Sequence, residues 1–372
     1  MLTPEELRVA RPLRSVVRAP DAPAGVPQTA RVEVSSPTMD EHHAAREFGD
    51  WVASFGYRRL FIVSSRHGKS LATAIERVVA YERAPARTGL RRATRLFRHV
   101  VASGADAIVA IGGGRCLDVA KLVAARAGVP LIVVPTQLSH DGICSPVAVI
   151  PGDDGVTRSL PAAAPAAAYF SLATIARSPA RSLRAGIGDL ISNPFALRDW
   201  ELAALTGHDH IDERAWHLSM ESFGMIEPSL EAIEHRGLRN PKFLGLLSHA
   251  LANSGAAMVL AGNSRPASGA EHKISHAIDI ELGGRALHGE QVAFACIISS
   301  ALHGLPVAPL VEAFFKLGLP HRPEHLGLTN PEVAAMILAA PRTRPGRFTV
   351  LEKAELDHAR VRALVDSLWP EG

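Results

Sequence analysis

Three histidines near the middle of the second half of the chain have the types and spacing of metal ligands. His272 and His276 are four residues apart, so on a helix they share one face, and His288 follows sixteen residues after His272. Asp189, further upstream, offers a carboxylate. Two imidazoles and a carboxylate with an open coordination position are typical of a catalytic metal site. Surface histidines are the alternative, since the chain has 17 of them.

A glycine-rich turn is the second candidate site. Gly112, Gly113 and Gly114 follow the apolar run 107–111 and precede a helical pattern. Because glycine has no Cβ, backbone amides there can approach a phosphate, and the helix N-terminus adds partial positive charge. The turn is neither a GxGxxG fingerprint nor a P-loop, so a plain tight turn is the alternative. Asp118 could bind a cofactor or simply favour the first helical turn.

The residues after an early strand bear on the choice of nucleotide. An acid there would bind the ribose hydroxyls of NAD(H), whereas a basic residue suits the 2′-phosphate of NADP(H). The chain has Ser65 and Arg66 at this place and no acid as far as Lys69. These residues favour NADP(H).

Composition places the chain among ordinary globular proteins. Its 372 residues suggest two domains, and it has 21% charged residues and a formal net charge of +3. No basic block interleaved with aromatic residues occurs, so nucleic acid is not an expected partner. No apolar run reaches the ~20 residues of a membrane span, and the N-terminus lacks the apolar core of a signal peptide. We therefore expect a cytoplasmic protein.

Strand and helix patterns alternate in the first half of the chain. The expected strands are 32–34, 59–63, 107–111 and 130–134, and the expected helices are 42–55, 71–81, 89–103 and 118–126. After about residue 171 helical patterns follow, over 182–206, 210–225, 227–235, 240–262, 269–280, 288–304, 307–317 and 349–369. Strands that alternate with helices imply a parallel, doubly wound sheet.

We therefore predict an α/β protein in which a doubly wound, parallel-sheet nucleotide-binding domain precedes an all-helical metal-binding domain. The expected boundaries are a tail at 1–30, a dinucleotide-binding domain at 31–177 and a metal and substrate domain at 178–372. The cleft between two such domains is the default place for a ligand.

Five blocks of the sequence resemble one family. Residues 112–121 resemble the GGGxxxDxxK motif of the dehydroquinate synthase-like and iron-containing alcohol dehydrogenase superfamily. Residues 135–146 resemble the PT..SHDG..SP of sn-glycerol-1-phosphate dehydrogenases, as do the blocks 186–200, 265–279 and 287–291. Chance agreement of five blocks in this order is implausible.

The resemblance implies an activity and a set of site residues. The activity is the NAD(P)H-dependent reduction of dihydroxyacetone phosphate, or a related ketose phosphate, to sn-glycerol 1-phosphate. A divalent metal, usually zinc, would be held by Asp189, His272 and His288. The nucleotide pyrophosphate would lie on the glycine turn. Residues near nicotinamide or substrate would be Thr136, Ser139 and Asp141.

Two further residues are expected to contact the substrate beside this metal. His276 could relay a proton or hydrogen-bond a substrate hydroxyl, with helix packing as the alternative. Arg265 is the expected phosphate clamp, because a guanidinium fork suits a phosphate, and its alternative is a pairing with a helix end. Related proteins are often dimers or larger, so we expect a homo-oligomer.

Two other functions are alternatives to the dehydrogenase. A sugar phosphate cyclase of the dehydroquinate synthase type is an NAD- and metal-dependent lyase on the same scaffold. Such enzymes need several lysines, including a Gly-Gly-Lys soon after the Pro-Thr strand, whereas this chain has Cys144-Ser145-Pro146 there and six lysines in all. A non-catalytic binding protein is the third reading, and the complete Asp/His/His set argues against it.

Overall fold

The computed structural model describes residues 30–36, 40–84, 89–152, 157–230 and 237–370. The expected tail at 1–30 lies outside these residues except for its last position. Contacts within the chain divide it into two compact units. The sheet unit holds the described residues from 30 to 183 and from 237 to 259, and the helical unit holds those from 184 to 230 and from 260 to 370. The single domain boundary expected near residue 178 stays a prediction.

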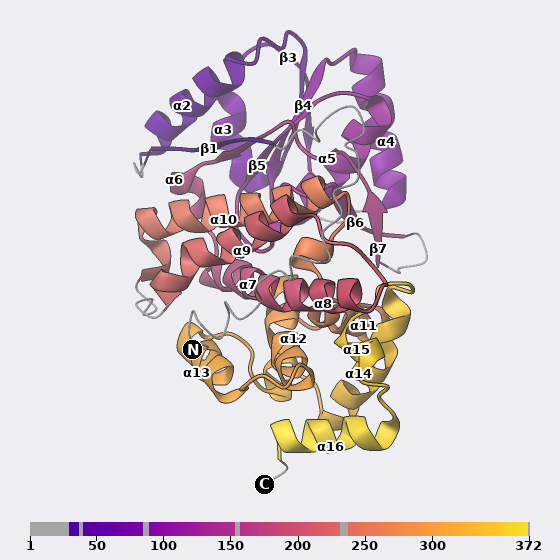
Figure 1. Ribbon diagram of the computed structural model, residues 1–372. Helices are drawn as coiled ribbons and strands as arrows, with labels where there is room; N and C mark the ends of the chain where they lie inside the picture. Colours follow the sequence, from indigo (N-terminus) through magenta and orange to yellow (C-terminus); the bar gives the residue numbers. More distant parts are fainter. Residues whose placement is uncertain (1–29, 37–39, 85–88, 153–156, 231–236, 371–372) are drawn as a thin grey trace. The chain divides into compact units, whose positions relative to one another are not determined.

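Six strands form the parallel sheet of the sheet unit (Figure 1). In spatial order they are β1 (Arg31–Val34), β8 (Ala167–Phe170), β5 (Leu131–Pro135), β4 (Ala107–Gly112), β2 (Leu60–Ser64) and β3 (Val78–Arg83). Each pairing is parallel, which confirms the predicted doubly wound sheet. The chain passes from β2 to β3 on one side and then to β4 on the other. The topological switch point therefore lies between β2 and β4.

Helices cover both faces of this sheet. They are α2 (Glu41–Ala53), α3 (Lys69–Thr73), α4 (Leu90–Ser103) and α5 (Gly114–Ala127). Phe48 and Trp51 of α2 share a buried cluster with Leu71 of α3 and with the strand residues Ile62 and Val109. Because successive strand residues face opposite sides, the intervening strand residues face α4 and α5, which lie on the other side of the sheet in Figure 1.

The rest of the sheet unit is a hairpin and two helices. The elements are β6 (Val147–Pro151), β7 (Thr157–Pro161), α6 (Leu172–Ile175) and α10 (Pro241–Ala261). Among the described helices, α10 is the one long and apolar enough by length and composition to cross a membrane, and 67% of its apolar window is buried. A long, mostly buried apolar helix is also typical of a globular core. Ser254 on α10 donates to Asp141 of the same unit at 2.7 Å.

Helices alone make up the described part of the helical unit, apart from short turns and 3₁₀ segments. They are α8 (Asn193–Leu205), α9 (Glu213–Leu230), α11 (Ala270–Leu282), α12 (His288–Leu302), α13 (Ala308–Leu317), α14 (Asn330–Thr343), α15 (Val350–Lys353) and α16 (His358–Leu368), together with the end of α7 (Ala180–Ile191). The predicted helical character of this part is confirmed. The helix expected over 182–206 is two helices, because Pro194 has no N–H to continue α7.

Other expected helices also differ. The helix expected over 349–369 is two helices, α15 and α16, and those expected over 210–225 and 227–235 are, as far as Leu230, the single helix α9. The helix expected over 71–81 is wrong after Thr73. Residues 71–81 contain the end of α3 and then the edge strand β3, which pairs with β2. Arg77, directly before the strand, has a φ of 59°, a left-handed conformation that ends any helix. Val78, Val79 and Tyr81 are the β-branched and aromatic residues that favour a strand.

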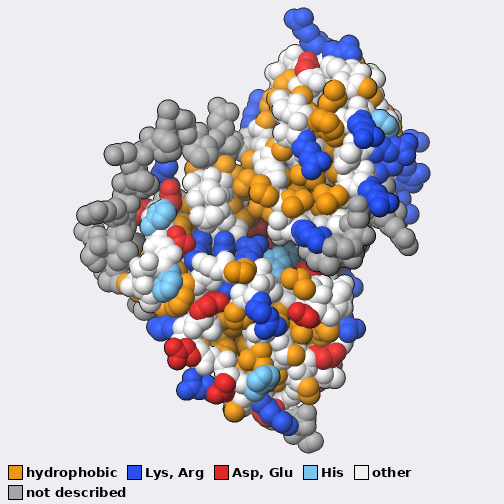
Figure 2. Space-filling view, turned by 90° about the vertical axis from the view of Figure 1, so that its right-hand side faces the viewer, with side chains coloured by type: hydrophobic (Ala, Val, Ile, Leu, Met, Phe, Trp, Pro, Cys, Tyr) orange, Lys and Arg blue, Asp and Glu red, His pale blue; other side chains and the backbone are white. Residues whose placement is uncertain are grey.

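Basic side chains gather on part of the surface of the sheet unit. α4 exposes Arg91, Arg95 and Arg98, and Figure 2 shows Lys and Arg side chains clustered on the upper right of the face that it draws. Elsewhere on that face, charges of both signs are interspersed with uncharged atoms.

Candidate functional site

Three helices carry the predicted metal ligands. Asp189 lies in the last turn of α7, His272 in the first turn of α11, and His288 is the first residue of α12. The carboxylate of Glu290 accepts a hydrogen bond from the backbone N–H of Leu287 at 2.9 Å and so caps α12. This cap fixes the helix end from which the His288 side chain departs.

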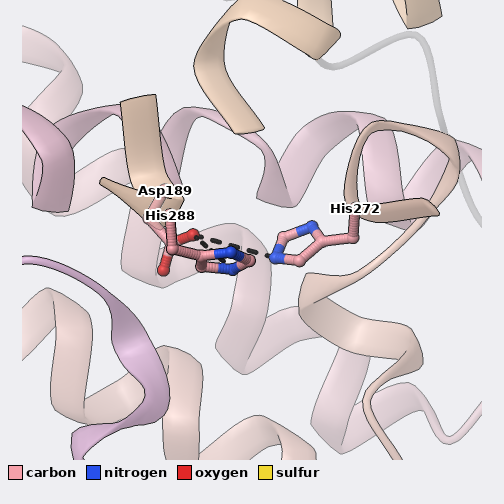
Figure 3. Close-up of side chains that lie close together, drawn as sticks. All are labelled: Asp189, His272 and His288. Carbon is pink, nitrogen blue, oxygen red and sulfur yellow. Dashed lines mark ion pairs between the residues drawn. The ribbon is translucent and has the colours of Figure 1, made fainter. Parts of the chain in front are cut away.

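The structure brings the three side chains together. One Asp189 oxygen, Oδ1, lies 3.7 Å from Nε2 of His272 and 3.7 Å from Nε2 of His288. In Figure 3 both imidazole rings reach toward this carboxylate. One ligand atom from each residue lies within 4.8 Å of the other two, and no other such group occurs among the described His, Cys, Asp and Glu residues. The His288 side chain is 32% exposed, which leaves one side of the group open to a ligand.

Two glycines permit this close approach. A Cβ on Gly289, next to His288, would lie 1.9 Å from the carbonyl oxygen of Ala185 on α7. A Cβ on Gly188, next to Asp189, would lie 2.6 Å from the carbonyl oxygen of Gly289. Only residues without Cβ let the backbones of α7 and α12 lie so close.

A buried carboxyl group orients His272. Oε1 of Glu271 lies 3.0 Å from Nδ1 of His272 and accepts a hydrogen bond from the backbone N–H of Gly269 at 2.6 Å. Burial, followed by the neighbouring His288 and His276, holds the pKa of His272 well below its usual range, so the ring is neutral. Nδ1 faces Glu271 and Nε2 faces Asp189, which is how a metal-ligating histidine is usually held.

These residues fit a divalent metal ion. In a tetrahedral site with bonds of about 2.1 Å, neighbouring ligand atoms lie ~3.4 Å apart, close to the observed 3.7 Å. The ligands are one carboxylate and two imidazoles, a donor set that catalytic zinc sites use. Burial, followed by the nearby Asp199, raises the pKa of Glu271 to about 8, and a cation on His272 would favour its ionised form.

His276 lies beside this group, with its ring centroid 6.1 Å from that of His288 and 6.5 Å from that of His272. Its Nε2 lies 3.1 Å from Nη2 of Arg344. Because arginine only donates, Nε2 is the acceptor and the ring proton is on Nδ1. Burial, followed by Arg344, lowers the pKa of His276 well below its usual range. The sequence reasoning missed Arg344.

Arg265 is buried, and its guanidinium already has partners. Nε donates to Asp209 at 2.7 Å and Nη1 donates to the carbonyl oxygen of Phe348 at 2.7 Å. These contacts connect Arg265 to the segment that follows α14.

Ser65 and Gly112, two of the predicted nucleotide residues, meet at the switch point of the sheet unit. The backbone N–H of Ser65, after β2, donates to the carbonyl oxygen of Ile111 on β4 at 2.7 Å. The side chain of Ser65 adjoins Gly112, since a Cβ on Gly112 would lie 3.3 Å from it. Arg66 is exposed and donates to His67. Open parallel sheets bind ligands at this kind of crevice.

The glycine turn suits a nucleotide pyrophosphate. α5 begins at Gly114 with Gly113 as its N-cap, and no side chain caps that end among the described residues. A Cβ on Gly114 would lie 2.5 Å from Nε2 of His140, and one on Gly113 would lie 3.0 Å from the Gln137 amide. Both neighbours are polar, and the helix N-terminus favours an anion.

A buried lysine holds the loop after β5. Lys121 of α5 is completely buried, forms an ion pair with Asp118 at 3.3 Å and donates to the carbonyl oxygen of Gly142 at 2.6 Å. Thr136, Ser139 and Asp141, all buried, lie in the segment that this contact anchors. The Asp118 carboxylate is therefore an ion-pair partner of Lys121 in this structure.

Known proteins share this architecture. A family model for iron-containing alcohol dehydrogenases matches residues 41–179. The crystal structure of glycerol dehydrogenase from Schizosaccharomyces pombe has a TM-score of 0.72 at 18% identity, and the match covers 91% of this chain and 89% of that chain. The fold is therefore that of the iron-containing alcohol dehydrogenase and dehydroquinate synthase-like proteins, as predicted.

Relatives in sequence are more specific. Glycerol-1-phosphate dehydrogenase (NAD(P)+) from Hyperthermus butylicus is 37% identical over 291 residues, which cover 78% of this chain and 82% of that protein. The protein of that name from Pyrococcus furiosus is 42% identical over 247 residues, 65% of this chain and 69% of that protein. The chain belongs to the glycerol-1-phosphate dehydrogenase family, and the cyclase alternative is not favoured.

Proposed function

We propose that this chain uses NAD(P)H and a divalent metal ion to reduce dihydroxyacetone phosphate to sn-glycerol 1-phosphate. The observation that carries the proposal is the group Asp189, His272 and His288, in a chain with 37% identity to a glycerol-1-phosphate dehydrogenase over 82% of its length. Asp189 and the two histidines would hold the ion, and zinc is the metal that this donor set favours.

The residues of the chain have separable tasks around the reaction. When bound, the metal ion polarises the substrate ketone and the nicotinamide supplies a hydride. Asp189 lowers the net charge of the site, and Glu271 holds the His272 ring. The Nδ1–H of His276, fixed by Arg344, is the donor proposed for a substrate oxygen.

For the nucleotide, we propose that Gly112, Gly113 and Gly114 face the pyrophosphate, helped by the N-terminus of α5. Ser65 and Arg66 favour NADP(H), because neither side chain is acidic and an acidic side chain there would repel a 2′-phosphate. Asp118 would act on this site through Lys121. Thr136, Ser139 and Asp141 are proposed near the nicotinamide or the substrate. Saturation curves with NADH and NADPH would rank the two cofactors.

We also propose a cytoplasmic homo-oligomer that acts on small phosphorylated substrates. The support is the resemblance to a family whose members are often dimers or larger. Light scattering on the purified chain would give the mass in solution, and a mass equal to one chain would refute this part.

The test of the function is an assay with zinc-loaded protein and dihydroxyacetone phosphate, in which the loss of NADPH or NADH absorbance is followed and the product enantiomer is identified. We expect oxidation of the nucleotide and sn-glycerol 1-phosphate as the product. Absence of oxidation by protein that demonstrably binds metal and nucleotide would refute the proposed substrate.

A further inference from the structure

Four cationic side chains gather near His276 in the helical unit: Arg265, Lys273, Arg344 and Arg347. Two of them have carboxylate partners, since Arg265 pairs with Asp209 at 2.7 Å and Lys273 pairs with Glu352. Within the described part of the chain, Arg344 and Arg347 have no carboxylate within ion-pair distance, and both are only partly exposed. Partial burial of a charge without an opposite charge costs free energy, so a bound anion would stabilise these two arginines.

The contacts of these two arginines are all with neutral acceptors. Nη1 of Arg344 donates to Oγ of Ser264 at 2.7 Å and to Oγ of Ser268 at 3.3 Å, and Nη2 donates to His276. Nη1 of Arg347 donates to the carbonyl oxygen of Ser268 at 2.6 Å. A guanidinium has five N–H donors, so each group keeps donors for a ligand. Burial, followed by the like charges of Arg344 and Arg265, lowers the pKa of Arg347 to about 9, although Asp209 and Glu271 act in the opposite direction.

The segment that carries the arginines is fixed against the helix that carries the histidines. Nζ of Lys273 on α11 donates to the carbonyl oxygen of Arg347 at 2.8 Å, and Thr343 donates to the carbonyl oxygen of Lys273 at 3.3 Å. Arg265 holds the next residue through the carbonyl oxygen of Phe348. A preformed site of this kind loses little entropy when its ligand binds.

We propose that Arg344 and Arg347 bind the phosphate group of the substrate, and that Arg265 and Lys273 are positioning residues for them. This inference rests on the proposed function and names its phosphate subsite. Two guanidinium forks suit the oxygens of a phosphate dianion, which supplies the opposite charge that the pair lacks.

The position of the two arginines relative to the metal ligands fits a short substrate. His276 is close to both parts: its ring is 6.1 Å from that of His288, and its Nε2 is 3.1 Å from Nη2 of Arg344. In a three-carbon ketose phosphate the carbonyl oxygen and the phosphorus are joined by four bonds of about 1.5 Å, a reach of roughly 4–5 Å. The bonds to the metal ion and to a guanidinium lengthen this reach at either end, to the order of the 6.1 Å and 3.1 Å steps that lead from His288 through His276 to Arg344.

Inorganic phosphate is the direct probe. Its dissociation constant would be measured by calorimetry on the zinc-loaded chain and on R347M and R344M. The matched control is R342M, because Arg342 is an exposed residue of α14 close in sequence to both. We expect phosphate to bind about 10- to 100-fold more weakly to R347M and R344M and equally well to R342M. The ratio of kcat/KM for dihydroxyacetone phosphate to that for dihydroxyacetone should fall by a similar factor, with zinc content unchanged.

The outcomes separate this inference from the proposed function. Wild-type affinities for phosphate in both R347M and R344M would overturn the subsite, even if dihydroxyacetone phosphate is reduced. Weakened phosphate binding in a chain that reduces no dihydroxyacetone phosphate would support the subsite and refute the substrate. If R347M does not fold, R347K takes its place, because lysine retains the positive charge without the guanidinium fork. Phosphate binding by R347K as tight as by the wild type would overturn the role of the Arg347 fork.

Discussion

Replacing Gly289 by alanine should weaken the metal site although it removes no ligand. The new Cβ would lie 1.9 Å from the carbonyl oxygen of Ala185, whereas real Cβ contacts are essentially never under 3.0 Å. α12 must therefore move from α7 by about 1.1 Å. If that shift reaches the side chains, the 3.7 Å between His288 and Asp189 becomes about 4.8 Å. Bonds of about 2.1 Å span at most ~4.2 Å across one ion, so the two ligands could no longer share it.

The assay is a zinc titration of G289A by competition with a chelator of known affinity. We expect zinc affinity to fall by at least about 10-fold, together with a loss of about 1–3 kcal/mol of stability from overpacking. The matched control is G224A in α9 of the same unit, because a Cβ there has open space within 4 Å. G224A should bind zinc normally and be as stable as the wild type or slightly more stable.

A folded G289A protein with wild-type zinc affinity would contradict this expectation. It would mean that the spacing of α7 and α12 does not set the distance between Asp189 and His288. A loss of zinc in both G289A and G224A would point to a general effect of alanine instead.

Three other predictions concern buried groups. E271Q cannot acquire the negative charge that a cation on His272 would favour in Glu271, so it should weaken zinc binding about 10-fold in the same titration. An unchanged affinity would show that this charge does not tune the ligand. K121M should lower the free energy of unfolding by about 3 kcal/mol in denaturant, because it breaks a buried ion pair with Asp118, and a loss below about 1 kcal/mol would contradict that role. Burial raises the pKa values of the Cys116 and Cys144 thiols to about 12, so they stay protonated below that pH. A thiol reagent at mildly alkaline pH should leave them unmodified until the protein unfolds, and rapid labelling of the native protein would contradict this.

Local patterns predicted β1, β2, β4 and β5 of the six-stranded sheet, whereas β3, β8 and the hairpin β6–β7 were not predicted. Apolar runs bounded by glycine or proline predicted β4 and β5. The glycines at 112–114, between β4 and α5, indicated where β4 ends. The edge strand β3 was missed because residues 78–83 lack alternation of apolar and polar residues, and their strand conformation depends on pairing with β2.

The metal group could be predicted because its signal is local, whereas the arginines around it could not. His272 and His276 are one helical turn apart, and the family blocks supply Asp189 and His288. Arg344 and Arg347 follow α14, a helix that the sequence reasoning did not predict. The capping-box pattern of Thr329 and Glu332 could have predicted the start of this helix.

Arg265 illustrates the same limit. Its position seven residues before His272 suggested a phosphate clamp, but its partner Asp209 is 56 residues away in sequence. No local pattern encodes that pairing, so the sequence alone could not show that the Arg265 guanidinium has a carboxylate partner.

We propose that Asp189, His272 and His288 hold a metal ion on which the reduction depends. The most direct test is to titrate metal-free protein with zinc and to measure, on the same samples, bound metal per chain and the rate of dihydroxyacetone phosphate reduction. We expect one ion per chain, a rate that rises in proportion to occupancy, and the loss of both bound metal and activity in D189N. Full activity in metal-free protein, or normal metal content and turnover in D189N, would contradict it.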